Sequence, residues 1–266
     1  MKIDFQETTK DLAVRIDIHT KFGSQDIDRW MLDLIKLQPT SKILDVGCGS
    51  GKQCFSYFDE LRGAADITGG DVSEELLSQA KAENKRRNID IRFDHLDFNQ
   101  PFLYPDNSFD FVSCCFAIYY AENIPQTISE MHRVTKPEGR LFTTGPMPEN
   151  KKLFYEIIKE ATNKPIPPMP GSSRYSTEIM STINALYSHV ELHVFENPLT
   201  FDNVEPYLAY TRASMSEDRK LWGSLFVEKD DFEKIMSQIE LAARKRIDRD
   251  GKLVMTKVVG GILATK

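Results

Sequence analysis

Short apolar runs alternate with amphipathic stripes along the first half of the chain. Apolar residues recur at helical spacing over 27–37, and Gln38-Pro39-Thr40 ends that stripe. Further helical stripes follow, separated by short runs rich in aliphatic residues. This alternation is typical of a parallel, doubly wound α/β sheet. We expect strands over 42–46, 65–70, 89–93, 109–115 and 140–144, and helices over 52–61, 73–85 and 124–134.

The second half of the chain is less regular and indicates additions to the same domain. A Pro-rich loop at 165–171 stands between predicted helices over 149–162 and 176–187. We interpret 1–266 as a single domain with an N-terminal helical cap over 1–38 and a lid or acceptor-binding insert over 146–188. Further along we expect a strand over 189–195, helices over 203–214 and 229–249, and a last strand over 253–264 that Gly260-Gly261 interrupts.

A glycine-rich loop, Asp45-Val46-Gly47-Cys48-Gly49-Ser50-Gly51, lies between a predicted strand and a predicted helix. Glycines at such a place let the backbone turn sharply and let a ligand approach closely. The helix N-terminus behind the loop adds unpaired N–H groups and positive potential, which suit a carboxylate or a phosphate. Asp71 ends the second predicted strand, where an acid accepts hydrogen bonds from ribose hydroxyls.

Two kinds of cofactor compete for this loop, and a tight turn without any ligand stays open as a third interpretation. A dinucleotide site needs G-x-G-x-x-G, whereas here the third glycine comes one residue early and Lys52 takes a position that should be small. Asp45 would repel a pyrophosphate and attract an ammonium group. A zwitterionic ligand with an uncharged sugar, such as S-adenosylmethionine, therefore fits better.

Five ordered motifs carry a resemblance to a known family. The segment 42–51, KILDVGCGSG, resembles the first motif of class I S-adenosylmethionine-dependent methyltransferases of the small-molecule type. Asp71-Val72-Ser73, Asp97-Phe98, 104–110 (YPDNSFD) and 131–141 (MHRVTKPEGRL) match later motifs at the family's spacing, and together they span about 27–145. The resemblance implies a Rossmann-like, seven-stranded sheet with the last strand antiparallel and a helical lid insert.

The same resemblance implies how the cofactor would be held. The glycine loop would hold the methionine tail, Asp71 the ribose, Val72 the adenine face and Asp97 the adenine amino group. Glu138 departs from the family, which usually has a second glycine before the fifth strand, and this changes only a turn. The cofactor-binding residues expected on this basis are Asp45, Gly47, Cys48, Gly49, Asp71, Val72, Asp97, Phe98 and Cys114.

The expected chemistry places few demands on catalytic side chains. Methyl transfer from a sulfonium is an in-line displacement with a neutral leaving group, so alignment of the reacting atoms supplies much of the catalysis. Tyr119 and Tyr120 follow the fourth predicted strand, where many small-molecule relatives have a His pair. His19 lies in an N-terminal segment that in this family folds over the cofactor. We take Tyr119, Tyr120 and His19 as candidate catalytic or positioning residues, and we predict no metal site.

Composition and charge narrow the partners. The formal net charge is −6, and the one dense basic run, Lys85-Arg86-Arg87, ends a predicted helix, so the sequence does not favour nucleic acid. The sequence shows no signal-peptide core, no apolar run long enough to cross a membrane and no metal-type cysteine spacing, which indicates a cytoplasmic protein with reduced thiols. We expect a small-molecule acceptor, no nucleic acid, no membrane, and a monomer or a homodimer.

The end of the fourth predicted strand bears on the acceptor. Ser113-Cys114-Cys115-Phe116 lacks the Asn/Asp-Pro-Pro-aromatic motif of base methylation, and only Glu122 stands where protein arginine methylation uses a glutamate pair. The prediction is therefore methyl transfer to O, N or C of a small molecule, one of specialised metabolism. Two alternatives stay open, a non-catalytic S-adenosylmethionine-binding protein and an RNA or tRNA methyltransferase. Asp45 and Lys52 argue against a nicotinamide-dependent oxidoreductase.

Overall fold

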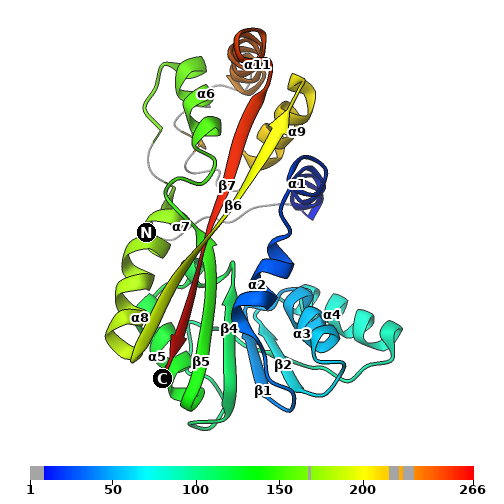
Figure 1. Cartoon of the computed structure of the whole chain (residues 1–266), viewed down its shortest axis with the longest axis vertical. Helices are drawn as coiled ribbons and strands as arrows, with labels where there is room; N and C mark the ends of the chain where they lie inside the picture. The colour runs from blue at the N-terminus through cyan, green and yellow to red at the C-terminus, as the bar shows by residue number, and fades with distance from the viewer. Residues whose placement is uncertain (1–8, 167–168, 216–221, 224–230) are drawn as a thin grey trace. The chain divides into compact units, whose positions relative to one another are not determined.

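The computed structural model describes residues 9–166, 169–215, 222–223 and 231–266 (Figure 1). Contacts divide the chain into two compact units, each built from three stretches of sequence. The first, which we call the helical unit, comprises Met1–Gln25, Pro148–Pro170 and Glu196–Val258. The second, the sheet unit, comprises Asp26–Met147, Gly171–Phe195 and Val259–Lys266.

The predicted doubly wound sheet is confirmed. Within the described residues it has seven strands in the order β3-β2-β1-β4-β5-β7-β6, with β1 to β5 parallel and β7 antiparallel to β5. This is the Rossmann-like arrangement that the sequence motifs imply. The strands are β1 (Lys42–Val46), β2 (Asp66–Asp71), β3 (Arg92–His95), β4 (Phe109–Cys115), β5 (Thr135–Pro146), β6 (His189–Phe201) and β7 (Leu253–Thr265).

Helices cover both faces of the sheet in the sheet unit (Figure 1). Helix α2, which precedes β1, and the crossover helices α3 and α4 lie on one face, and α5 and α8 lie on the other. Right-handed connections require this change of face, because the strand order reverses between β3 and β4. These elements are α2 (Ile27–Ile35), α3 (Lys52–Glu60), α4 (Glu74–Arg87), α5 (Ile124–Val134), α7 (Pro170–Arg174), a π-helical turn (Tyr175–Ile179), α8 (Met180–Leu186) and a 3-10 turn (Ile118–Tyr120).

The sequence explains why these elements begin and end where they do. Strand β1 is buried after its first residue, because a central parallel strand is covered on both faces. Ser73 caps the start of helix α4, since its hydroxyl accepts a hydrogen bond from the Leu76 N–H. The first turn of the helix carries Glu74 and Glu75, which suit the positive end of the helix dipole. Asn88 ends the same helix in the left-handed conformation.

Several boundaries differ from the expected ones, and three of the differences have a clear physical reason. The third strand begins at Arg92, not at 89, because the Asn84 side chain binds both the N–H and the carbonyl of Ile91 and ties that segment to α4. The turn expected at 137–139 lies within β5 as a bulge between the pairs Phe109–Thr135 and Phe111–Arg140. Glu138 adopts a positive φ of 61° within this bulge.

The interruption expected at Gly260-Gly261 is the third difference, since β7 is continuous there. The two glycines make room for close packing and do not break the strand. A Cβ on Gly260 would lie 2.6 Å from the Met147 sulfur, and a Cβ on Gly261 would lie 2.8 Å from the Trp30 ring. Both positions therefore need glycine for space.

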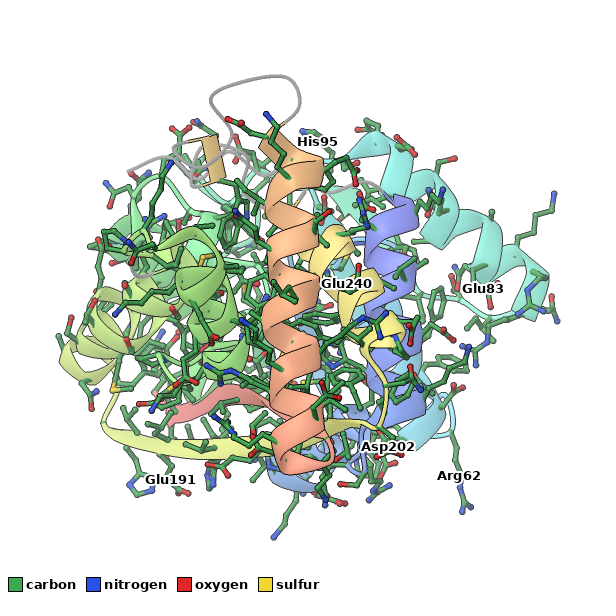
Figure 2. The ribbon with its side chains drawn as sticks, turned by 90° about the horizontal axis from the view of Figure 1, so that it is seen from above. Arg62, Glu83, His95, Glu191, Asp202 and Glu240 are labelled. Atoms are coloured by element: carbon green, nitrogen blue, oxygen red, sulfur yellow. The ribbon has the colours of Figure 1, made fainter. Side chains whose placement is uncertain are left out.

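The helical unit has a core of its own. It contains α1 (Thr9–Phe22), α6 (Lys152–Thr162), α9 (Val204–Ser214) and α11 (Asp231–Asp250), together with parts of β6 and β7. Tyr207 and Tyr210 are buried in this cluster with Phe154 and Trp222. Helix α11 turns an apolar stripe inward and carries charged side chains such as Glu240, which pairs with Arg244 at 2.8 Å (Figure 2).

The predicted cap and lid are each shared between the two units. In the cap, residues 9–25 belong to the helical unit and 26–38 to the sheet unit. In the lid, residues 148–170 belong to the helical unit and 171–188 to the sheet unit. Their roles as cap and lid stay predictions. None of the helices in the described ranges combines the length and the apolar character needed to cross a bilayer.

Candidate cofactor site

The glycine loop between β1 and α3 curls over the carboxyl end of β2. The backbone N–H groups of Gly47 and Cys48 both donate to the Gly70 carbonyl, at 2.8 and 3.0 Å. Gly47 and Gly49 have φ of +69° and +56°, the left-handed region in which a Cβ is strained. The loop thus holds a conformation that depends on its glycines, with its remaining N–H groups near the start of α3.

Asp45 is a buried carboxylate beneath this loop, with 2% of its surface exposed. The Ser113 hydroxyl donates to its Oδ1 at 2.6 Å, and the Cys54 thiol lies 3.7 Å from its Oδ2. Burial raises the pKa of Asp45 to about 7, the bonds from Ser113 and Cys54 oppose the rise, and the charge of Asp71 adds to it. A cationic ligand group that binds near Asp45 would therefore lower the pKa of this carboxyl group again and favour its ionised form.

This pKa predicts a pH-dependent affinity for a ligand with an ammonium group. Because the pKa of Asp45 is raised, the carboxyl group is protonated below about pH 7, and an ammonium must first drive off that proton. We expect the affinity for S-adenosylmethionine to fall as pH drops from 7 to 5.5, by up to tenfold per unit. Calorimetric titration across this range measures it, and an equally steep fall in Asp45→Asn would contradict the assignment.

Asp71 links the end of β2 to the glycine loop. Its Oδ2 accepts from the Gly49 N–H at 2.8 Å, and its Oδ1 accepts from the Ser73 N–H at 2.9 Å. A carboxylate oxygen has two lone-pair sites, so each oxygen keeps one acceptor site for a ligand hydroxyl. The next residue, Val72, has 57% of its surface exposed, and an exposed apolar side chain at this position offers a surface for a flat ring.

The segment after β3 is tied to the segment after β4. Asp97 accepts from both the backbone and the side-chain N–H of Asn99, and the Asn99 side-chain oxygen accepts from the Glu122 N–H at 2.7 Å. The Phe98 carbonyl accepts from the Thr127 hydroxyl at 2.9 Å. The Phe98 ring lies against the glycine loop, since a Cβ on Gly47 would come within 3.6 Å of it.

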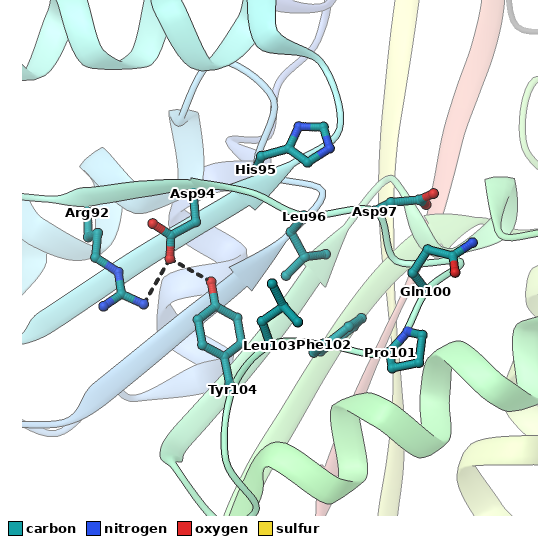
Figure 3. A pocket seen from close by; sticks show the side chains of 10 residues that line it. All are labelled: Arg92, Asp94, His95, Leu96, Asp97, Gln100, Pro101, Phe102, Leu103 and Tyr104. Carbon is teal, nitrogen blue, oxygen red and sulfur yellow. Dashed lines mark hydrogen bonds and ion pairs between the residues drawn. The ribbon is translucent and has the colours of Figure 1, made fainter.

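A cavity of about 670 Å³ adjoins Asp97 on the outer edge of the sheet (Figure 3). Asp97 and Gln100 line one end of it, and Arg92 and Tyr104 line the other, where both contact Asp94 at 2.8 and 2.9 Å. This cavity has no signal in the sequence, because its lining has no motif apart from Asp97 and the turn that begins at Tyr104. The lining residues are Arg92, Asp94, His95, Leu96, Asp97, Gln100, Pro101, Phe102, Leu103 and Tyr104.

Three further residues that the sequence predicts for the site, Cys114, Tyr119 and Tyr120, lie at the end of β4 and in the turn after it. Cys114 is fully buried near the end of β4, and burial raises the pKa of its thiol. Tyr119 and Tyr120 form the 3-10 turn after β4, with ring centroids 4.5 Å apart. Arg174 fixes this turn by donating to the Tyr119 carbonyl at 2.8 Å.

His19 belongs to the helical unit and packs its ring edge against Tyr210 at 5.5 Å. Burial, followed by the charges of Lys257, Lys151 and Arg15, lowers the pKa of His19 to about 2, so the imidazole is neutral at physiological pH.

The predicted cofactor residues lie at the carboxyl ends of β1, β2 and β4 and in the segment after β3, all within the sheet unit.

Fold and loop together define a Rossmann-like protein with a site for a nucleoside-type cofactor. The chain has 28% identity over 122 residues to nocamycin O-methyltransferase of Saccharothrix syringae, covering 46% of this chain and 44% of that protein. It has 33% identity over 115 residues to a ubiquinone/menaquinone biosynthesis C-methyltransferase of Bdellovibrio bacteriovorus, covering 42% and 48%. The chain thus matches about half the length of these relatives.

A likeness to solved structures supports the fold. The YcgJ protein of Bacillus subtilis superimposes with a TM-score of 0.58 at 15% identity, over 90% of this chain and 97% of that one. The family profile described as a methyltransferase domain matches residues 37–210, well over half of the 266 residues. The chain belongs to this family, that of the class I S-adenosylmethionine-dependent methyltransferases.

Proposed function

We propose that this protein transfers a methyl group from S-adenosylmethionine to an oxygen, nitrogen or carbon atom of a small-molecule acceptor, one of specialised metabolism. The observation that carries the proposal is the pairing of Asp71 with the glycine loop. Asp71 accepts from the Gly49 N–H while Asp45 lies buried under the same loop. One carboxylate thus suits a ribose and the other an ammonium group, which together match this zwitterionic nucleoside.

The polar and apolar groups of this site suit each part of the cofactor. Asp45, Gly47, Cys48 and Gly49 would hold the amino-acid tail, and the N–H groups at the start of α3 suit its carboxylate. Asp71 would accept from the ribose hydroxyls, and the exposed Val72 would pack on the adenine. Asp97 and the Phe98 backbone would bind the adenine edge. Cys114, buried in β4, would support the tail from below.

When bound, the cofactor supplies an activated methyl group on a sulfonium. This chain's contribution would be to bind and orient, since alignment of the reacting atoms can lower such a barrier by about 7–11 kcal/mol. Tyr119 and Tyr120, which Arg174 holds after β4, would position the acceptor. Because its pKa is lowered to about 2, His19 is a neutral imidazole and a weak base at physiological pH, so we propose it as a positioning residue and not as a base.

The acceptor class follows from two supporting observations. The relatives that match include one O-methyltransferase and one C-methyltransferase, both of which are named for small organic compounds. The end of β4 lacks the base-methylation motif. Neither observation selects the atom that is methylated, so the proposal covers O, N and C acceptors.

Release of S-adenosylhomocysteine tests the proposal. The purified chain is incubated with S-adenosylmethionine and pools of phenols, carboxylic acids and amines, and the product is quantified by mass spectrometry. We expect micromolar cofactor binding and product that appears only with certain pools. Binding without release in every pool would favour the non-catalytic alternative, and absence of binding would overturn the proposal and direct attention to nicotinamide cofactors.

A further inference from the structure

Strand β6 forms one edge of the seven-stranded sheet. In the strand order of the described residues it comes last, with β7 on its inner side. Residues 189–195 of this strand belong to the sheet unit, and we call them the edge segment. The outer side of an edge strand presents a row of backbone N–H and carbonyl groups that can pair with another strand. The edge segment is therefore a place at which a second chain can extend the sheet.

Apolar side chains lie exposed on one face of the edge segment. Successive side chains of a strand point to opposite faces, so Val190, Leu192 and Val194 share a face. Leu192 has 41% of its surface exposed, and Val194 has 47%. Strand β7 covers one side of Leu192, since a Cβ on Gly260 would lie 3.4 Å from its Cδ1. The exposed part of this apolar face therefore lies away from β7.

Polar side chains occupy the other face of the edge segment. The Glu191 carboxylate lies between two imidazoles of its own strand, 2.8 Å from His189 Nε2 and 3.1 Å from His193 Nε2. The Glu191 side chain is 47% exposed and points away from the ribbon (Figure 2). A carboxylate has about four lone-pair sites, and these two contacts use only two of them. Glu191 can therefore accept a further hydrogen bond from an imidazole of a second chain.

The sequence of the edge segment is symmetric about Leu192. When two copies of a sheet join edge to edge around a two-fold axis, the edge strands run antiparallel and opposite residues share a face. With the axis at Leu192, that residue meets its own copy, Val190 meets Val194 of the second copy, and Glu191 meets His193 of the second copy. An axis at Glu191 would instead place two carboxylates opposite each other, which is destabilising.

We propose that the edge segment joins two copies of this chain into a homodimer by antiparallel pairing of their β6 strands, centred on Leu192. Apolar side chains then meet on one face of the extended sheet, and carboxylates meet imidazoles on the other. One strand pair buries less surface than the roughly 1,200–2,000 Å² of a stable interface, so we expect a dissociation constant on the order of 10 µM. The inference goes beyond the proposed function and does not depend on it, because the edge segment contains no residue of the cofactor site.

Sedimentation velocity of the full chain over a range of concentrations tests the association. We expect a monomer at low concentration and a dimer at high concentration, with a midpoint on the order of 10 µM. A monomer throughout, up to roughly thirtyfold above that midpoint, would overturn the proposal.

A charged variant tests the surface that the dimer uses. Leu192→Lys places two ammonium groups opposite each other and should weaken the dimer by about tenfold or more. Leu103→Lys is the matched control, because Leu103 is 97% exposed and lines the cavity near β3, at the opposite edge of the sheet. It should leave the dimer unchanged. Circular dichroism checks that both variants are folded, and an intact dimer in folded Leu192→Lys would refute the site.

A charge exchange tests the register without touching the apolar face. Glu191→Lys should weaken the dimer, because a lysine would then face His193 of the second copy. The double variant Glu191→Lys/His193→Glu should recover the affinity, because each lysine would face a glutamate of the second copy. A double variant no tighter than Glu191→Lys would show that these positions do not meet across the interface.

A cysteine at the proposed two-fold axis gives an independent measurement of the register. Opposite residues of antiparallel strands have Cα atoms about 4.5–5.5 Å apart, within the range of about 4.4–6.8 Å for a disulfide. Oxidised glutathione should therefore link two copies of Leu192→Cys, whereas His189→Cys, which would face Phe195 of the second copy, and the unmodified chain should stay unlinked. A dimer in which Leu192→Cys does not form this link would contradict the pairing.

Discussion

Replacing Asp71 by alanine should lower the affinity for S-adenosylmethionine on the order of 100-fold. If Asp71 binds the ribose as proposed, the variant would lose charge-assisted hydrogen bonds to it, each worth about 1.5–3 kcal/mol. It also removes the acceptor of the Gly49 N–H, at 2.8 Å, so the glycine loop loses one of its anchors. Isothermal titration of the variant and the unmodified chain measures the change.

A matched control lies at the other end of the same strand. Asp66 begins β2, is exposed, and contacts only Lys42 at 3.8 Å among the ion pairs of the described residues. Asp66→Ala should therefore bind the cofactor as tightly as the unmodified chain. If Asp71→Ala kept its affinity, or if Asp66→Ala lost affinity equally, the ribose assignment would be wrong.

Replacing Gly47 by alanine should destabilise the fold by about 2–4 kcal/mol and abolish cofactor binding. The new Cβ would lie 2.6 Å from the Ala117 Cβ, which forces a backbone shift, and overpacking of this kind costs about 1–3 kcal/mol. The positive φ of 69° adds about 1 kcal/mol for a residue with a side chain. Urea denaturation measures the free energy of unfolding.

The variant Gly49→Ala separates the steric clash from the cost of the left-handed backbone. Gly49 also has a positive φ, 56°, but a Cβ there would meet only the Leu76 side chain at 3.9 Å, an ordinary contact. This variant should lose about 1 kcal/mol, the cost of the left-handed conformation alone. Similar losses in both variants would show that the approach of Ala117 to the loop has no energetic weight.

The sequence predicted the sheet unit in most of its detail because local pattern determines it. The apolar run of β1, the Ser73 cap and the boundaries of β4 and α5 can all be read from neighbouring residues, and the structure confirms them. The glycine loop could also be predicted, because its conformation needs positive φ angles that glycine adopts without strain. The predicted start of β3 was wrong because the Asn84 side chain forms hydrogen bonds with the Ile91 backbone, which keeps that residue out of the strand. The spacing of apolar residues does not reveal such bonds.

The helical unit could not be predicted from pattern in the same way. Helices α6, α9 and α11 were expected, whereas α1 was covered only by the helical cap predicted over 1–38, and its own bounds were not predicted. The association of these helices depends on contacts between stretches that are far apart in sequence. Lys151 illustrates the difference: as a lysine at the start of a helix it predicts an exposed side chain, and the structure buries it against Tyr210. The strain at its backbone has no sequence signal either, because positive φ at lysine is uncommon.

Assembly of the helical unit from three stretches also sets the order of events while the chain is made. Helix α1 ends at Phe22, and its partner α9 begins at Val204, 182 positions later. At roughly 5–20 residues per second, a ribosome needs about 10–40 s to cover that distance. During this interval Val14, Ile18 and Phe22, which the finished protein packs into the helical core, have no partner from α9. The five parallel strands β1 to β5 are complete by residue 146, so they are synthesised before α9, whereas β7, which pairs with β5, is synthesised last.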